Sequence, residues 1–125
     1  IPKVKGGSII KQEAFTMSLL FDTYGALLTE KQQTYFDLYY NQDLSLAEIA
    51  EQEGISRQGV HDAISRSEAL LASFERVTGC VAREQKLRHA LAAITAEAQP
   101  LLQAGDPATR QGAQRILAAV DSLKE

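Results

Sequence analysis

The sequence predicts an all-α protein, and three observations indicate this fold class. Apolar residues recur at steps of three and four along most of the 125 residues, as on one face of a helix. No stretch alternates apolar and polar residues for long enough to predict a strand. Ser, Thr and Asp stand where helices should begin, and Gly or Pro follows where they should end.

Composition and the single cysteine exclude several classes of protein. The 45% apolar and 23% charged residues are typical of a globular chain. No segment approaches the roughly 18 apolar residues of a membrane-spanning helix, so we expect no membrane association. Cys80 is alone, which excludes an internal disulfide and a cysteine zinc site and favours a cytoplasmic location.

The chain is expected to have three parts. Residues 1–10 contain Gly-Gly-Ser and show no periodicity, which predicts a flexible N-terminal segment. A domain is expected over residues 11–76, with its first helix over 13–26. Residues 77–125 are expected to form a C-terminal helical extension.

Capping boxes predict where the next two helices begin. Thr29 with Gln32, and Ser45 with Glu48, each place a hydroxyl three residues before a side chain that can bond back to the chain. The first of these helices carries four aromatic residues, which we assign to the core rather than to base stacking: Tyr35, Phe36, Tyr39 and Tyr40.

The segment from Leu46 to Ile64 carries the most informative motif. Ala50 is small enough for two helices to cross closely, and Gly54 allows the chain to turn sharply. Val60 is a branched residue that can lock the second helix onto the first. This spacing predicts a helix-turn-helix, in which the second helix normally enters the major groove of DNA. The alternative is an αα-corner without a ligand.

The exposed face of this second helix supplies the candidate binding residues. They are Arg57, Gln58, His61, Ser65 and Arg66. Arg57 could bind guanine through two hydrogen bonds, Gln58 could read adenine, and Arg66 could hold a phosphate. The alternative for each is a solvated helix face, and for Arg66 an ion pair with Asp62.

Net charge argues against a simple DNA-binding module. Residues 29–76 contain four Lys or Arg against nine Asp or Glu, a net charge of −5. Duplex affinity comes mainly from cations that displace counterions, and Asp62 faces the same way as the candidate binding residues. An acidic surface instead favours a basic partner.

Beyond residue 64 the apolar stripe continues as a long helix or a broken pair, with Gly79 as the weak point. Its expected inward residues are Leu70, Phe74, Val77 and Val81, then Leu87, Leu91, Ile94 and Ala98. Pro100 should end this stretch, and Asp106 with Pro107 should start a last helix. One face of that helix carries Ile116, Leu117, Val120 and Leu123. The long stripe either folds back on its own domain together with residues 116–123 or pairs with a second copy, and the surplus of apolar surface favours a homodimer.

Enzymatic motifs are absent from the sequence. There is no phosphate-binding glycine loop, nucleophile elbow or zinc-protease motif. His61 and His89 have no carboxylate or cysteine cluster beside them, and Cys80 lies within the apolar stripe. We therefore expect no enzyme activity, no cofactor and no metal site.

Several segments carry a resemblance to known proteins. Residues 27–71 resemble the promoter-reading helix-turn-helix of bacterial sigma factors. FDTYGALLTEKQ, LYY, SLAEIAE and ISRQGVHDAI are more closely similar to the YlxM family of small bacterial proteins, a likeness that covers roughly residues 11–87. Gly59 and Asp62 depart from basic sigma-factor sequences, which puts promoter reading in doubt.

The resemblance implies a sigma-region-4-like helix-turn-helix with an N-terminal helix and a C-terminal helical extension. It also implies a gene beside that of the signal recognition particle GTPase, and a role in that pathway. Our first hypothesis is thus a regulatory adaptor that binds the particle's protein or RNA. The alternative is a regulator that reads duplex DNA with Arg57 and Gln58, and a third option is a scaffold dimer with an idle recognition face.

Overall fold

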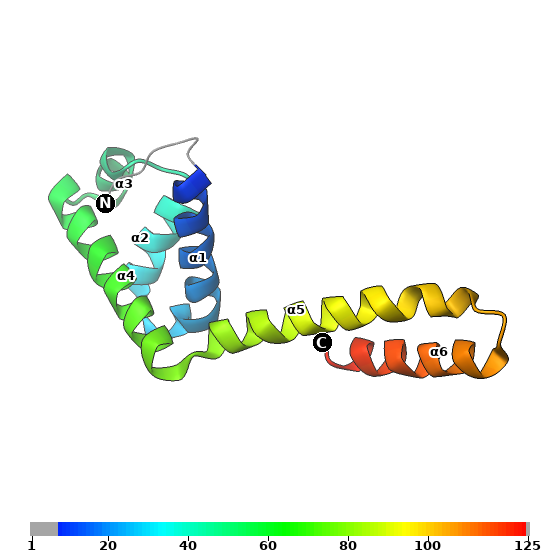
Figure 1. Cartoon of the computed structure of the whole chain (residues 1–125). Helices are drawn as coiled ribbons and strands as arrows, with labels where there is room; N and C mark the ends of the chain where they lie inside the picture. The colour runs from blue at the N-terminus through cyan, green and yellow to red at the C-terminus, as the bar shows by residue number, and fades with distance from the viewer. Residues whose placement is uncertain (1–7, 125) are drawn as a thin grey trace. The chain divides into compact units, whose positions relative to one another are not determined.

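The computed structural model describes residues 8–124, with side chains from residue 13 onward, and confirms the all-α fold. The described residues form helices joined by short turns, without a strand (Figure 1). The elements are α1 (Ser8–Tyr24), η1 (Gly25–Leu27), α2 (Glu30–Tyr40), α3 (Leu46–Glu53), α4 (Arg57–Thr78), α5 (Cys80–Ala98), η2 (Gln99–Gln103) and α6 (Pro107–Ser122). The chain divides after Val81 into two compact units.

Both predicted capping boxes are confirmed at the starts of α2 and α3. The Gln32 amide nitrogen donates to the Thr29 hydroxyl at 3.2 Å, and the Thr29 amide donates to the Gln32 side chain at 2.9 Å. The corresponding distances for Ser45 and Glu48 are 3.1 and 3.0 Å. Each box satisfies two backbone donors that a helix start would otherwise leave without partners.

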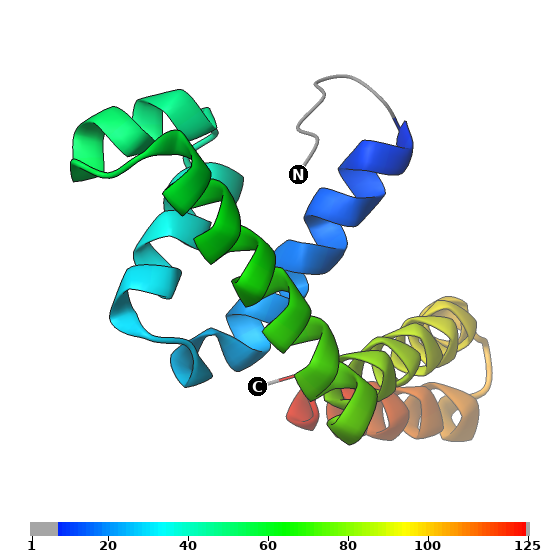
Figure 2. The same ribbon diagram turned by 90° about the vertical axis from the view of Figure 1, so that its left-hand side faces the viewer.

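The core of the first unit forms where α4 packs against each of α1, α2 and α3 (Figure 2). One cluster joins α2, α3 and the first half of α4, and consists of Tyr35, Leu38, Tyr39, Leu46, Ile49, Ala50, Val60 and Ile64. A second cluster joins α1, α2, the second half of α4 and the first turn of α5, and consists of Leu20, Tyr24, Leu28, Phe36, Leu71 and Val81. The core therefore fixes α4 along most of its length.

The first helix begins earlier than the sequence predicted. α1 starts at Ser8, within the segment expected to be flexible, and residues 1–7 of that segment lie outside the described residues. The helical spacing of Phe15, Leu19, Leu20, Tyr24 and Leu27 predicts one apolar face, but Phe15 is 63% exposed and Leu27 is 65% exposed, so neither belongs to the buried face. Leu20 and Tyr24 carry that face instead.

The helical stripe after the motif breaks at Gly79, as predicted. Gly79 has φ of +63° and ends α4 in the left-handed conformation, which glycine adopts without steric cost. The assigned inward residues were partly wrong, because Leu71 is fully buried while Leu70 is 38% exposed and Val77 is 82% exposed. Phe74 is partly buried and packs against the core of its own unit.

The second unit contains a helical hairpin, in which α6 runs back alongside α5 (Figures 1 and 2). Helix α5 ends at Ala98, just before Pro100, and Asp106 caps α6 by accepting from the Ala108 amide at 3.3 Å. Arg110 donates to the Ala104 carbonyl at 2.6 Å and so ties the turn to α6. Among the described residues, none of the helices is apolar enough over a sufficient length to cross a membrane.

Candidate recognition helix

The contact between α3 and α4 depends on the three residues that the motif singled out. Gly54 has φ of +70°, and the amides of Gly54 and Ile55 both donate to the Ala50 carbonyl, at 3.0 and 3.1 Å. Val60 is fully buried one turn into α4, and Ala50 is 9% exposed. Ser56 caps α4 by accepting from the Gly59 amide at 2.9 Å. The predicted helix-turn-helix geometry is confirmed.

Burial of Val60 and Ile64 sets which residues of α4 face solvent. Arg57, Gln58 and Arg66 are exposed. His61 and Ser65 are partly exposed, and the His61 side chain retains 35% of its accessible surface. Gln58, Ser65 and Arg66 thus lie on the outer side of α4 and His61 at the edge of that side, while Arg57 is exposed as the first residue of the helix.

Three neighbouring side chains on this side of α4 interact with one another. The Gln58 amide donates to Asp62 Oδ1 at 2.9 Å, and His61 Nδ1 lies 3.4 Å from the same oxygen. The hydrogen bond from Gln58 lowers the pKa of Asp62 most, followed by the one from His61, and the Arg66 charge contributes further. Asp62 is therefore a carboxylate at neutral pH, in the middle of the exposed face.

This arrangement limits what the candidate face can bind. A Gln58 amide that is bonded to Asp62 must release it before it can pair with adenine. The Asp62 carboxylate repels phosphate, although it could accept from the exocyclic amine of cytosine. The hydrogen bond between Gln58 and Asp62 was not predicted from the sequence. The signal for it is their separation of four residues, which places two side chains next to each other on a helix.

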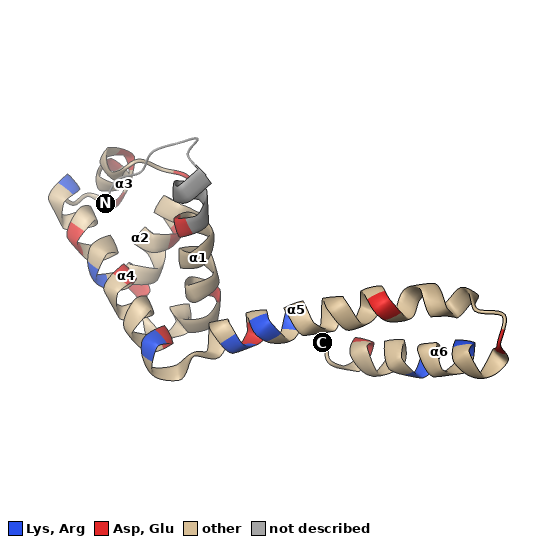
Figure 3. Cartoon of the chain, in the orientation of Figure 1, with Lys and Arg blue, Asp and Glu red and all other residues tan. Residues whose placement is uncertain are grey.

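Helix α3, the first of the pair, is acidic. It carries Glu48, Glu51 and Glu53 and contains neither Lys nor Arg (Figure 3). In a helix-turn-helix bound to DNA, the first helix crosses the phosphate backbone. Three carboxylates there oppose that contact, so the acidic character is concentrated on the element that would lie nearest the phosphates.

Two glutamates of α4, Glu68 and Glu75, are partly buried and form hydrogen bonds with tyrosines. Tyr40 donates its hydroxyl to Glu68, and Tyr24 donates to Glu75 at 2.5 Å. Burial, followed by the bond to Glu68, raises the pKa of Tyr40, so its phenol stays protonated and remains a donor. Sequence separations of 28 and 51 residues gave no signal for these pairs.

Glu75 also holds the beginning of α5. Its Oε1 accepts from the Val81 backbone amide at 3.0 Å, and Thr78 bonds to the Tyr24 hydroxyl. These contacts fix the chain on both sides of Gly79. They give Glu75 a structural role rather than a place on a binding surface. Within residues 13–124, no three His, Cys, Asp or Glu side chains converge as a metal site requires.

Comparison with known proteins identifies the family. The UPF0122 family, described as "Putative helix-turn-helix protein, YlxM / p13 like", matches residues 11–104. A UPF0122 protein of Symbiobacterium thermophilum is 46% identical over 104 residues, which cover 83% of this chain and 91% of the relative. One of Halalkalibacterium halodurans is 41% identical over 109 residues, with coverages of 86% and 94%.

A shorter match has a higher identity. A UPF0122 protein of Clostridium kluyveri is 58% identical over 64 residues, which cover 51% of this chain and 58% of the relative. The family match over residues 11–104 includes α2, α3 and α4, which carry the confirmed helix-turn-helix geometry. The chain therefore belongs to the UPF0122 family of YlxM / p13-like helix-turn-helix proteins.

Proposed function

We propose that this protein is a non-enzymatic regulatory adaptor that binds the protein or the RNA of the signal recognition particle. The observation that carries the proposal is the crossing of α3 and α4, which presents Arg57, Gln58 and His61 outward around the Asp62 carboxylate. The resemblance to the YlxM family supplies the pathway. These exposed side chains form the surface that contacts the particle. The proposal places the protein in the cytoplasm, where the particle is found.

Charge favours the protein of the particle over its RNA as the direct partner. The first unit presents Asp62 on α4 and three glutamates on α3. These carboxylates repel any phosphate backbone, whether in RNA or in DNA, and attract a basic protein surface. Arg57 and Arg66 then serve as isolated donors to acidic or carbonyl groups at the edge of the contact.

Sequence-specific DNA binding is the second candidate function. Exposed Arg57 and Arg66 on the helix that would enter the major groove favour it. A DNA regulator would lose affinity steeply with added salt. It would also gain affinity when a carboxylate is removed from its reading face.

Replacement of Asp62 by Asn distinguishes the two functions, because the change has opposite effects on them. We expect Asp62→Asn to weaken binding to the purified particle protein by about tenfold, the loss of one favourable charge contact. Asp22→Asn, an exposed carboxylate on α1, is the matched control and should leave binding unchanged. Titrations against the particle protein, its RNA and a duplex DNA pool provide the measurement.

The outcomes separate the candidates cleanly. If no binding to the particle protein or RNA is found at micromolar concentrations, alone or together, the adaptor proposal fails. If Asp62→Asn instead strengthens duplex binding and Arg57→Ala relaxes base preference, the protein is a DNA regulator.

A further inference from the structure

The second unit has little hydrophobic core of its own. Its buried residues are Leu91, Ala98, Ala113 and Val120, and two of these four are alanines. None of the large side chains that are fully buried in the described residues belongs to this unit. Five large apolar residues instead remain between 42% and 58% exposed, namely Leu87, Ile94, Leu101, Ile116 and Leu123. A two-helix hairpin with this burial needs a further surface to cover it.

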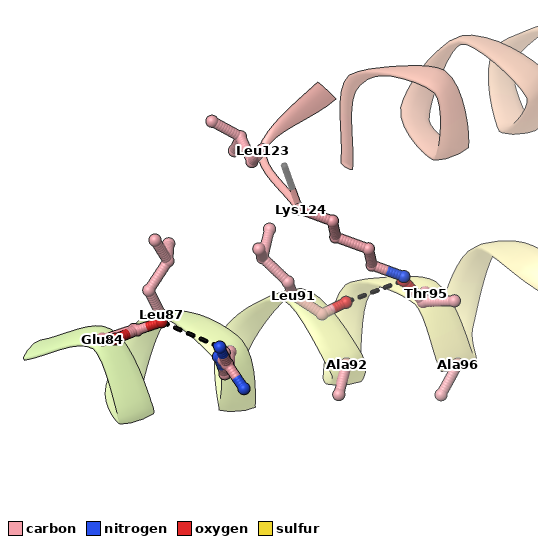
Figure 4. Close-up of a pocket in the computed structure, with 9 residues that line it drawn as sticks. Glu84, Leu87, Leu91, Ala92, Thr95, Ala96, Leu123 and Lys124 are labelled. Carbon is pink, nitrogen blue, oxygen red and sulfur yellow. Dashed lines mark hydrogen bonds and ion pairs between the residues drawn. The ribbon is translucent and has the colours of Figure 1, made fainter. Parts of the chain in front are cut away.

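An open apolar groove runs between α5 and the C-terminal end of α6 (Figure 4). It has a volume of about 820 Å³, and its apolar walls include Leu87, Leu91 and Leu123. Glu84 and Arg88 form an ion pair at 2.8 Å along the same helix, so their charges are balanced locally. The groove and the exposed leucines mark the hairpin as incomplete.

We propose that the hairpin is completed by a second copy of this chain, whose α5 packs antiparallel against α5 in a two-fold symmetric dimer. One stripe of α5 carries residues at steps of four, three, four and three, the spacing of a coiled-coil seam. The stripe consists of Arg83, Leu87, Ala90, Ile94 and Glu97. This pairing does not depend on which partner binds α4.

The order of side chains along the stripe specifies the antiparallel direction. A two-fold axis at Ala90 places Leu87 opposite Ile94 of the second copy, and Arg83 opposite Glu97 of the second copy. The two members of each pair lie at nearly equal distances before and after Ala90 in the sequence. Two apolar contacts and two opposite-charge contacts therefore form at once. In a parallel pairing in register, Arg83 would face Arg83 of the second copy and Glu97 would face Glu97 of the second copy. Each of these like-charge contacts is unfavourable.

Ala90 allows the two helices to approach closely at the axis. It is exposed, and it lines a shallow surface together with Ala82 and Ala93 and with the longer side chains of Gln85, Lys86 and His89. Helix α5 has 19 residues, or about 28 Å of length, so the paired segment spans most of it. The partner copy covers Leu87 and Ile94, which are 48% and 44% exposed in one chain.

Sedimentation of the full chain, with no partner present, tests this dimer. We expect wild-type protein to sediment mainly as a dimer at 50 µM, which is about ten times a Kd of about 5 µM. Leu87→Glu with Ile94→Glu should give a monomer with unchanged helical circular dichroism. Gln85→Glu, on another face of α5, is the control and should remain a dimer. A wild-type monomer at this concentration overturns the proposal.

Charge reversal tests the antiparallel direction. Arg83→Glu and Glu97→Arg should each weaken the dimer by at least threefold, and the double variant should recover the wild-type Kd, because the reversed charges again face each other. A double variant weaker than both single variants would overturn the antiparallel pairing.

Disulfide trapping gives a readout that does not depend on destabilising the dimer. In a Cys80→Ser background, Ala90→Cys should cross-link two chains under mild oxidation. Ala92→Cys, about 200° around the helix, should not. Equal cross-linking of both would overturn the assignment of the face.

Discussion

Single residues divide α4 into an inner side that fixes its orientation and an outer side that is available for contacts. Ile64 is fully buried, while Arg57, seven residues earlier on the same helix, is exposed. The burial of Ile64 was predicted from spacing alone, because residues three, four and seven apart share one side of a helix. The same spacing places Arg57 near the side of Ile64, and Arg57 is exposed because it is the first residue of α4. The interaction among Gln58, His61 and Asp62 was not predicted, since it depends on which rotamers the side chains adopt.

Replacing Ile64 by Ala measures how much the inner side contributes to stability. The change leaves a cavity where α2, α3 and α4 meet, so we expect the free energy of unfolding to fall by about 2–5 kcal/mol. Arg57→Ala, the control at the exposed start of α4, should change it by less than about 0.5 kcal/mol. Urea denaturation followed by circular dichroism gives both values. Equal midpoints for Ile64→Ala and wild type would show that Ile64 is not in the core.

At the scale of elements, helix starts were predictable and the phase of long helices was not. A cap is decided by a few adjacent residues, so Thr29, Ser45, Ser56 and Asp106 could be identified from local sequence. The buried face of α4 beyond Ile64 depends instead on where α1 packs. Leu70 and Leu71 are equally apolar, and only the packing of α1 and α2 against α4 selects Leu71 for burial.

The turn between α3 and α4 makes a prediction of its own. Gly54 has φ of +70°, and a Cβ added there would meet no atom within 4 Å. An alanine is therefore disfavoured by backbone conformation alone, and Gly54→Ala should lower the free energy of unfolding by roughly 1–2 kcal/mol. Gly54→Asn should cost less, since asparagine tolerates this conformation better.

A matched control separates conformation from crowding at Gly54. Gly105 also has open space around it, and its φ is not in the left-handed region. Gly105→Ala should therefore leave the free energy of unfolding unchanged or raise it by about 0.4–1 kcal/mol. Similar losses for Gly54→Ala and Gly105→Ala would contradict the role of the left-handed turn.

At the scale of the whole molecule, the two units differ in how they are held together. All of the large, fully buried side chains in the described residues lie in the first unit, where four helices enclose them. The second unit has two α-helices and a short 3-10 segment. The sequence predicted a helical extension there, but its apolar residues could not reveal whether they are covered within one chain or by another.

Hydrogen exchange of the intact chain tests this difference. In dilute solution, amides of α5 and α6 should open at a lower free-energy cost than those of α2 and α4, because less apolar surface holds them. Since the proposed dimer covers α5, a tenfold rise in protein concentration above Kd should slow exchange in α5 measurably, while α4 stays unchanged. The variant that carries Leu87→Glu and Ile94→Glu should lose this dependence on concentration. Uniform exchange across both units, at every concentration, would mean that the hairpin is as firmly held within one chain as the helix-turn-helix is.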